Sequence, residues 1–307
     1  MVAVIEAIYR FLWGDLITIP LPGGNSLGLS LLVILLIPTG IYFTIRTRVL
    51  PIRMFPDMVR ALRAKKEQKE HKGQKSSLST LQTLVVSTAT RVGMGNLVGV
   101  VAAVSAGGAG AVFWMWVTAL IGSSTAFIEA TLAQLHKEKD PLYGGYRGGP
   151  AYYIHHFFEK RSGEKKKKVL LAVLFAISGL ICWCGISQVI SNSVTSAFHN
   201  AFHIPPIYTT VVLVALAAVI IFRKTATVKV LDVLVPVMAG CYFLITVILI
   251  CMNFSALPGV FSRIFEEAFG IRQAVAGGLG TVVMNGVKRG LFSNEAGSGS
   301  APWLSLI

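Results

Sequence analysis

An uncharged run of 37 residues places the strongest constraint on the fold of this chain. Residues 92–128 contain no charged side chain. At about 1.5 Å per residue, one helix of this length would extend about 55 Å, whereas the hydrocarbon core of a bilayer is about 30 Å thick. The run therefore predicts two membrane-spanning helices, and the segment Gly107-Gly108-Ala109-Gly110 marks the turn between them.

The composition favours a membrane protein over a soluble one. Hydrophobic residues make up 54% of the chain and charged residues only 14%, and the mean hydropathy is +0.67. With the long run divided at its turn, the apolar segments of spanning length are 28–45, 78–105, 111–136, 169–196, 207–222 and 230–252. We therefore predict an all-α polytopic membrane protein that crosses the cell membrane several times.

The basic residues orient these spans. The chain has 28 Lys and Arg against 14 Asp and Glu, and 22 of the basic residues fall in three segments between spans, 46–75, 137–168 and 223–229. Every second segment between spans is basic, and such segments lie on the same side of the membrane, as the positive-inside rule requires. We expect these loops in the cytoplasm and the N-terminus outside, with lipid headgroups rather than nucleic acid as the partner of the basic charge.

A short pattern occurs twice, each time within an apolar segment. Arg91 to Gly99 is echoed by Arg289 to Gly297: in both, Asn follows Arg by five residues and Gly follows Asn by three. The first copy lies in an outward-going span, and the second lies in an inward-going one because four spans separate them. Inverted repeats with broken helices at their centres are how many secondary transporters build a substrate site at the bilayer midplane.

The repeat predicts three parts of the chain. Residues 1–77 would form an interfacial N-terminal segment, an extra transmembrane helix and a basic cytoplasmic loop. Residues 78–252 would form the first repeat of five helices, and residues 253–307 an outer segment and the first helix of the second repeat. The predicted inverted-repeat fold is therefore incomplete within this sequence.

The chemistry expected at the two breaks suits an amino acid and a cation. Glycine makes the backbone permissive in mid-span, and freed carbonyls can coordinate Na⁺ while helix N-termini bind a carboxylate. The candidate residues are Gly93, Met94, Gly95 and Asn96 in the first copy and Ser293 and Asn294 in the second. The alternative is that the glycines only permit close helix packing.

Polar and charged side chains inside the predicted spans add further candidates. Gln188 and Asn192 share one helix face, which would line the site or form ordinary interhelical hydrogen bonds. Glu129 lies toward the inner end of its span, where pairing with loop cations is the simpler explanation. Arg289 lies beside the second break, where it could neutralise a helix end or pair with Glu295.

Catalytic classes find no support in the sequence. It contains neither a phosphate-binding P-loop nor a recognisable grouping of Ser, His and Asp. We expect a secondary transporter rather than an enzyme or an ATP-driven pump, and we expect Na⁺ as the coupling ion with no bound cofactor.

Several motifs resemble the sodium:alanine symporter family. The most specific is the sixteen-residue segment from Gly107 to Gly122, with its Phe-Trp-Met-Trp core. Four further segments support the resemblance: Val92 to Val100, Gly148 to Tyr153, Leu234 to Ala239 and Gly290 to Pro302. Together these cover the chain from about residue 78 to its end, whereas the first 77 residues match weakly.

The resemblance implies a leucine-transporter-type fold, in which two inverted five-helix repeats enclose one amino acid and Na⁺. It implies that Gly93 to Asn96 contact the substrate, that Gly93 and Asn96 lie in the Na⁺ region, that Gln188 faces the substrate, and that the Asn294 region closes the pocket. The implied activity is inward symport of alanine or glycine with Na⁺.

Two alternatives stay open. One is an H⁺-coupled or exchanging amino-acid transporter on the same fold. The other is a non-transporting membrane remnant, because family members continue for about four or five more helices and the eighth core helix, which shares the Na⁺ site, is not in this sequence.

Overall fold

The computed structural model describes residues 2–20, 26–63, 94–141, 146–163, 168–222, 224–271 and 278–299, and almost all of the elements are helices. The helices are α1 (Val2–Trp13), α2 (Leu31–Arg46), α3 (Leu50–Arg53), α4 (Phe55–Arg63), α6 (Met94–Gly107), α7 (Gly110–Leu135), α8 (Pro150–Ser162), α9 (Leu170–Phe202), α10 (Pro206–Phe222), α11 (Lys224–Met252), the 3₁₀ turn η1 (Phe254–Ala256), α12 (Leu257–Ala268) and α13 (Leu279–Asn294). Two short antiparallel hairpins complete the fold, β1 (Ile17–Pro20) with β2 (Ser26–Leu29) and β3 (Glu138–Lys139) with β4 (Tyr146–Arg147).

Helices occupy the apolar segments that the sequence singles out. Helices α7 and α9 are each long and apolar enough to cross a bilayer on their own. The end of α11 and α12 would do so together, with a bend of 73° between them, and α2 and α10 are shorter apolar helices. The described helices therefore support an all-α membrane protein.

The glycine-rich turn lies where the uncharged run predicted it. Helix α6 ends at Gly107, and Gly108 has a φ of +80°, which side-chain-bearing residues rarely adopt. The buried carboxylate of Glu267 on α12 accepts hydrogen bonds from the backbone N–H groups of Ala109 (2.5 Å) and Gly110 (3.4 Å). A distant acidic side chain thus caps the start of α7, where unpaired N–H groups favour a negative charge.

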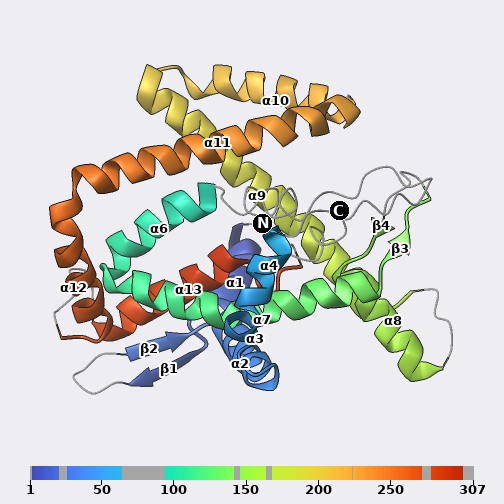
Figure 1. The fold of residues 1–307 in the computed structure, drawn as a ribbon. Helices are drawn as coiled ribbons and strands as arrows, with labels where there is room; N and C mark the ends of the chain where they lie inside the picture. Colours follow the sequence, from blue (N-terminus) through green and yellow to red (C-terminus); the bar gives the residue numbers. More distant parts are fainter. Residues whose placement is uncertain are drawn as a thin grey trace.

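Helices α7 and α13 form the centre of the structure. They lie side by side in the lower half of Figure 1, and α2, α6 and α12 also contact α7. Small residues allow the close approach: a Cβ added at Gly286 would meet Trp114 and the backbone of Ala111, and one at Gly290 would meet Thr118. The buried cluster beside this interface consists of Val33, Met284, Val287 and Leu291.

The N-terminal segment packs against α13 before the chain enters α2. The backbone of Gly280 lies against the carbonyl of Ser26 on β2, and Lys288 Nζ pairs with Asp15 Oδ1 at 2.8 Å. The β1–β2 hairpin was not predicted from the sequence. Helix α1 exposes a row of large apolar side chains, as an interfacial helix would: Val4, Ile5, Ile8, Phe11 and Leu12.

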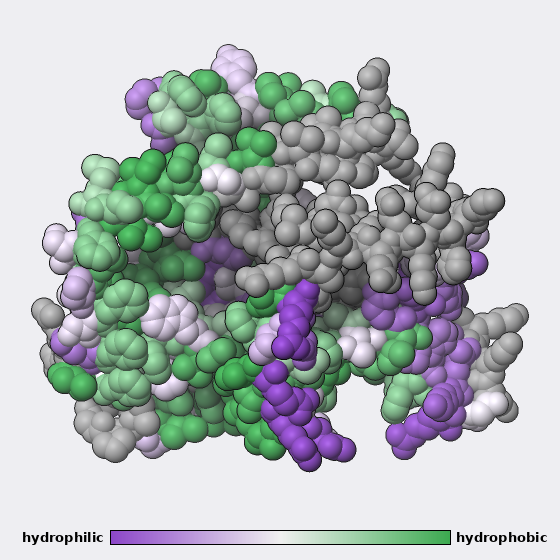
Figure 2. Space-filling view, in the orientation of Figure 1, coloured by the Kyte–Doolittle hydropathy of each residue, from purple (hydrophilic) through white to green (hydrophobic). Residues whose placement is uncertain are grey.

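The remaining helices present apolar side chains outward. In Figure 1, α10 and α11 lie at the top, and α9 joins α10 to the lower part of the structure. Apolar residues cover most of the left half of the same face in Figure 2, while hydrophilic residues gather at the lower centre and lower right. Side chains exposed on α9 include Leu174, Ile177, Leu180, Ile181 and Trp183. Such a surface suits contact with lipid or with further apolar helices.

The cap on α7 generates a stability prediction. Replacing Glu267 with Ala removes the acceptor of two backbone N–H groups and the partner of Arg263, so we expect it to destabilise the protein by about 1–3 kcal/mol. Glu266→Ala is the matched control, because that neighbouring carboxylate is more exposed and accepts from Ser262 on its own helix. Thermal unfolding in detergent, followed by size-exclusion chromatography, measures both; equal melting temperatures for the two variants would contradict the prediction.

Candidate functional site

The two copies of the repeated motif meet in the structure. Ser293 Oγ, in the last turn of α13, donates a hydrogen bond of 2.7 Å to Asn96 Oδ1, in the first turn of α6. The two residues are 197 positions apart in the chain. The beginning of α6 and the end of α13 therefore lie together, and each carries one copy of the repeated motif.

Helix α13 ends within the second copy. Helix α13 ends at Asn294, and the next residues include three with positive φ: Glu295 (54°), Gly297 (90°) and Gly299 (84°). Glycine adopts such angles without the steric cost that other residues pay, which explains its presence at 297 and 299. The chain is unwound from Glu295 to Gly299, as the motif predicted for this copy.

The first copy is only partly described. Arg91 and Gly93 lie outside the described residues, and with Gly93 so does part of the predicted Na⁺ region. Met94 and Gly95 are the first residues of α6, and Asn96 follows them. The predicted break in this copy therefore stays a prediction, whereas the start of α6 beside Asn96 is a feature of the structure.

Helix α7 holds the end of α13 and the unwound segment through main-chain groups. Asn294 Nδ2 donates to the carbonyl of Thr118 (3.1 Å), and Asn294 Oδ1 accepts from the N–H of Ala296 (2.9 Å). A Cβ added at Gly122 would overlap the Asn294 amide. The asparagine thus satisfies one carbonyl on α7 and one N–H of the unwound chain, as apolar surroundings require.

A buried carboxylate on α7 holds the next part of the break. Glu129, 8% exposed, accepts a hydrogen bond of 3.1 Å from the N–H of Gly297. The pKa of the Tyr153 phenol on α8 is raised above its usual value, chiefly by burial and in addition by the negative charge of Glu129. Glu129 is therefore linked both to the unwound segment and to α8.

These α7 contacts were not predicted from the sequence. The position of Glu129 in an apolar segment was a signal, although pairing with loop cations seemed the simpler explanation. The carbonyl of Thr118 has no such signal, because every residue carries a carbonyl. Only the packing of α7 on α13 selects that one.

Gln188 stays a prediction. It lies on an exposed part of α9. Within the described residues, no hydrogen bond joins it to Asn96, Ser293 or Asn294.

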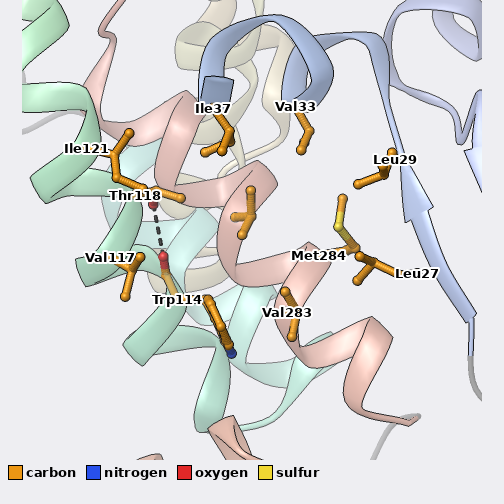
Figure 3. A pocket seen from close by; sticks show the side chains of 11 residues that line it. Leu27, Leu29, Val33, Ile37, Trp114, Val117, Thr118, Ile121, Val283 and Met284 are labelled. Carbon is orange, nitrogen blue, oxygen red and sulfur yellow. Dashed lines mark hydrogen bonds between the residues drawn. The ribbon is translucent and has the colours of Figure 1, made fainter. Parts of the chain in front are cut away.

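A cavity of about 180 Å³ lies between β2, α2, α7 and α13 and differs in chemistry from the junction of Asn96 and Ser293. Figure 3 shows its lining side chains, which come from β2, α2, α7 and α13: Leu27, Leu29, Val33, Ile37, Trp114, Val117, Thr118, Ile121, Val283, Met284 and Val287. Two of these side chains carry a polar group, and both groups are engaged: the Thr118 hydroxyl donates to the carbonyl of Trp114 (3.0 Å), and the Trp114 indole N–H donates to the carbonyl of Ala268 (3.1 Å). A charged solute would lose its hydration there without replacement, so the polar junction of Asn96 and Ser293 is the better candidate site.

Comparison with known proteins identifies relatives along almost the whole chain. The sequence is 43% identical to the amino-acid carrier protein AlsT of Bacillus subtilis over 269 residues. The matched region covers 87% of this chain and 55% of AlsT. It is 33% identical over 303 residues to the sodium/alanine symporter AgcS of Methanococcus maripaludis, which covers 98% of this chain and 62% of AgcS. It is 34% identical over 212 residues to the sodium/proton-dependent alanine carrier protein of Bacillus sp. strain PS3, which covers 68% of this chain and 45% of the relative.

The chain spans about half the length of the curated relatives it matches. The family described as the sodium:alanine symporter family matches residues 23–305, which include strand β2, the packed core and both copies of the repeated motif. This protein belongs to the sodium:alanine symporter family.

Proposed function

We propose that this protein supplies the substrate site of a secondary transporter that moves alanine or glycine into the cell together with Na⁺. The observation that carries the proposal is the hydrogen bond between Ser293 and Asn96, because it brings the start of α6 to the end of α13. A helix start carries partial positive charge and a helix end partial negative charge. A zwitterion and a cation find complementary partners at such a junction.

The proposed architecture is a leucine-transporter-type inverted repeat, with residues 78–252 as the first repeat and the second beginning within 253–307. Two features support it: both copies of the motif meet, and the second copy is unwound where the repeat requires a break. Basic loops in the cytoplasm and an outside N-terminus belong to the same proposal. Transport would be completed by helices beyond those described here, in line with the greater length of the relatives.

A second coupling ion has one specific observation in its favour. Glu129 is a buried carboxylate hydrogen-bonded to the unwound segment, and a carboxylate of this kind can take up and release a proton. The relative from strain PS3 is named as a sodium/proton-dependent carrier. H⁺ coupling through Glu129 is therefore the second candidate.

Coupling is tested by uptake of radiolabelled L-alanine into proteoliposomes containing the natural full-length protein. Na⁺ coupling predicts that replacing external Na⁺ with choline lowers the initial uptake rate at least about tenfold, because the site is completed by the ion. Persistence of full uptake in choline, together with stimulation by an inward proton gradient, would instead establish H⁺ coupling.

The junction itself is tested by Asn96→Ala and Ser293→Ala. Each variant removes one partner of the 2.7 Å hydrogen bond, and we expect alanine uptake to fall at least about tenfold with normal membrane insertion. Ser187→Ala is the control, because that exposed hydroxyl bonds only within its own helix, to the carbonyl of Trp183. Wild-type uptake in both junction variants would exclude this site.

The role of Glu129 separates into two testable parts. Glu129→Gln keeps an oxygen that can accept from the Gly297 N–H, whereas Glu129→Ala leaves that group without this acceptor. We expect the Ala variant to lose most Na⁺-driven uptake and the Gln variant to keep most of it. If the Gln variant keeps uptake driven by Na⁺ but loses stimulation by an inward proton gradient, the carboxyl proton is part of the coupling mechanism.

A further inference from the structure

We propose that His136 and His156 form a cytoplasmic pH sensor, in which acid drives the end of α7 and α8 apart and so slows transport. This role rests on the proposed function, because transport is the process that the sensor regulates. Three features of the structure carry it: the two histidine rings face each other, cations surround one of them, and α8 lies directly against the unwound segment that follows α13.

The two histidine rings face each other across the junction of α7 and α8. His136 directly follows the last residue of α7, and His156 lies in the second turn of α8. Their ring centroids are 5.3 Å apart. Figure 1 shows α8 beside the end of α7. Two neutral rings can pack at this distance, whereas two protonated rings repel each other.

Charges near the pair oppose a proton on His136. Burial lowers the pKa of this imidazole, and the positive charges of His156 and Lys160, both on α8, lower it further. Glu138 of β3 faces the other ring, with its Oε1 atom 3.4 Å from His156 Nε2, so it can pair with a protonated His156. A charged His136 therefore meets cations on α8 while the carboxylate lies beside the other ring.

The remaining charged groups do not titrate in the range of histidine or do not act across this junction. Arg147 of β4 lies 3.3 Å from the second oxygen of Glu138, and His155 pairs with Glu159 on its own helix at 3.4 Å. Helix α9, which also packs on α8, carries no Asp, Glu, Lys or Arg. Between about pH 7 and 5.5, imidazoles change charge while carboxylates, lysines and arginines stay ionised. The other charged residues on the described elements around the pair are Lys137, Lys139, Asp140 and Arg161.

Helix α8 is in direct contact with the unwound segment. A Cβ added at Gly299 would meet Pro150, the first residue of α8, at 2.7 Å. Two residues earlier, the N–H of Gly297 donates to Glu129 of α7. The negative charge of that glutamate also reaches Tyr153 of α8. The unwound segment is thus held between α7 and α8, and a change in the separation of these two helices is transmitted to it.

The sign of the response follows from the pKa of His136. Because this pKa is lowered in the packed arrangement, the proton binds more tightly when the two helices are apart. Acid therefore favours separation of α7 from α8, and neutral or alkaline pH favours the packed arrangement. Separation withdraws Pro150 from Gly299, so the backbone around the break loses support. We expect acid on the cytoplasmic side to lower the maximal rate of transport.

The first test measures the maximal rate of Na⁺-driven L-alanine uptake in proteoliposomes of the full-length protein. The pH is equal on both sides, so no proton gradient contributes. We expect the wild-type rate to fall at least about threefold from about pH 7.5 to 5.5, and His136→Gln and His156→Gln to remove most of this fall, because Gln stays neutral. His136→Lys carries a permanent charge and should be slow even at about pH 7.5.

His199→Gln is the matched control. This histidine lies near the other end of α9, where its Nδ1 atom is 3.2 Å from the carbonyl of Ile204. The variant should keep the wild-type dependence on pH. Size-exclusion profiles in detergent show whether each variant folds, and either Gln variant of the pair is sufficient to decide the question.

The second test measures the separation of α7 and α8 without transport. Spin labels are attached to cysteines placed at Leu135, the last residue of α7, and Phe157 of α8, in a chain without its four native cysteines; both positions are exposed. Double electron–electron resonance reports the distance between the labels. We expect a longer mean distance at acid pH in the wild-type background and no such change with His136→Gln.

Each result decides one question. A wild-type rate that does not fall with acid, an acid response that persists in both Gln variants, or a loss of uptake in them that is equal at every pH would overturn the sensor; so would a label distance that is independent of pH. Absence of alanine and glycine uptake by the wild type would refute the proposed function, and the label distance would then still show whether the junction responds to pH.

Discussion

The close packing of α7 against α13 is the interaction on which the rest of the structure depends. Because Gly286 and Gly290 lack side chains, the two helices approach until backbone and side chain touch. This approach brings the carbonyl of Thr118 within reach of Asn294 and the carboxylate of Glu129 within reach of Gly297. A bulkier α13 would separate these groups, and the unwound segment would lose its partners.

The unwound segment illustrates how a membrane environment limits irregular backbone. Water is not available in hydrocarbon to satisfy a freed N–H or carbonyl, so protein groups must do so. Here the amide of Asn294 and the carboxylate of Glu129 supply hydrogen bonds to Ala296 and Gly297. At the N-terminus of α7, the carboxylate of Glu267 accepts hydrogen bonds from the N–H groups of Ala109 and Gly110. Helix α7 thus combines a stabilised start with a surface that supports the break in α13.

Much of the fold could be predicted from sequence because membrane helices obey simple constraints of length and charge. The turn at Gly108, the helices at α2, α7, α9 and α10, and the end of α13 at Asn294 all follow from apolar runs and glycine. The β1–β2 hairpin was missed because its strands are only four residues long and lie in a weakly patterned segment. Gln188 could be placed on a helix, but the local sequence does not determine which other helix its side chain contacts.

By itself, the sequence determined that this is a helical membrane protein, where its long apolar helices lie, which two segments share a motif and which family it resembles. Those properties depend on hydrophobic length, charge asymmetry and local backbone freedom, all of which are readable along the chain. Only the tertiary structure decided that Ser293 bonds Asn96, that Glu129 accepts from the N–H of Gly297, and that the guanidinium of Arg289 lies against Gly99. These contacts join residues far apart in the chain, and they depend on how closely the packed helices approach each other.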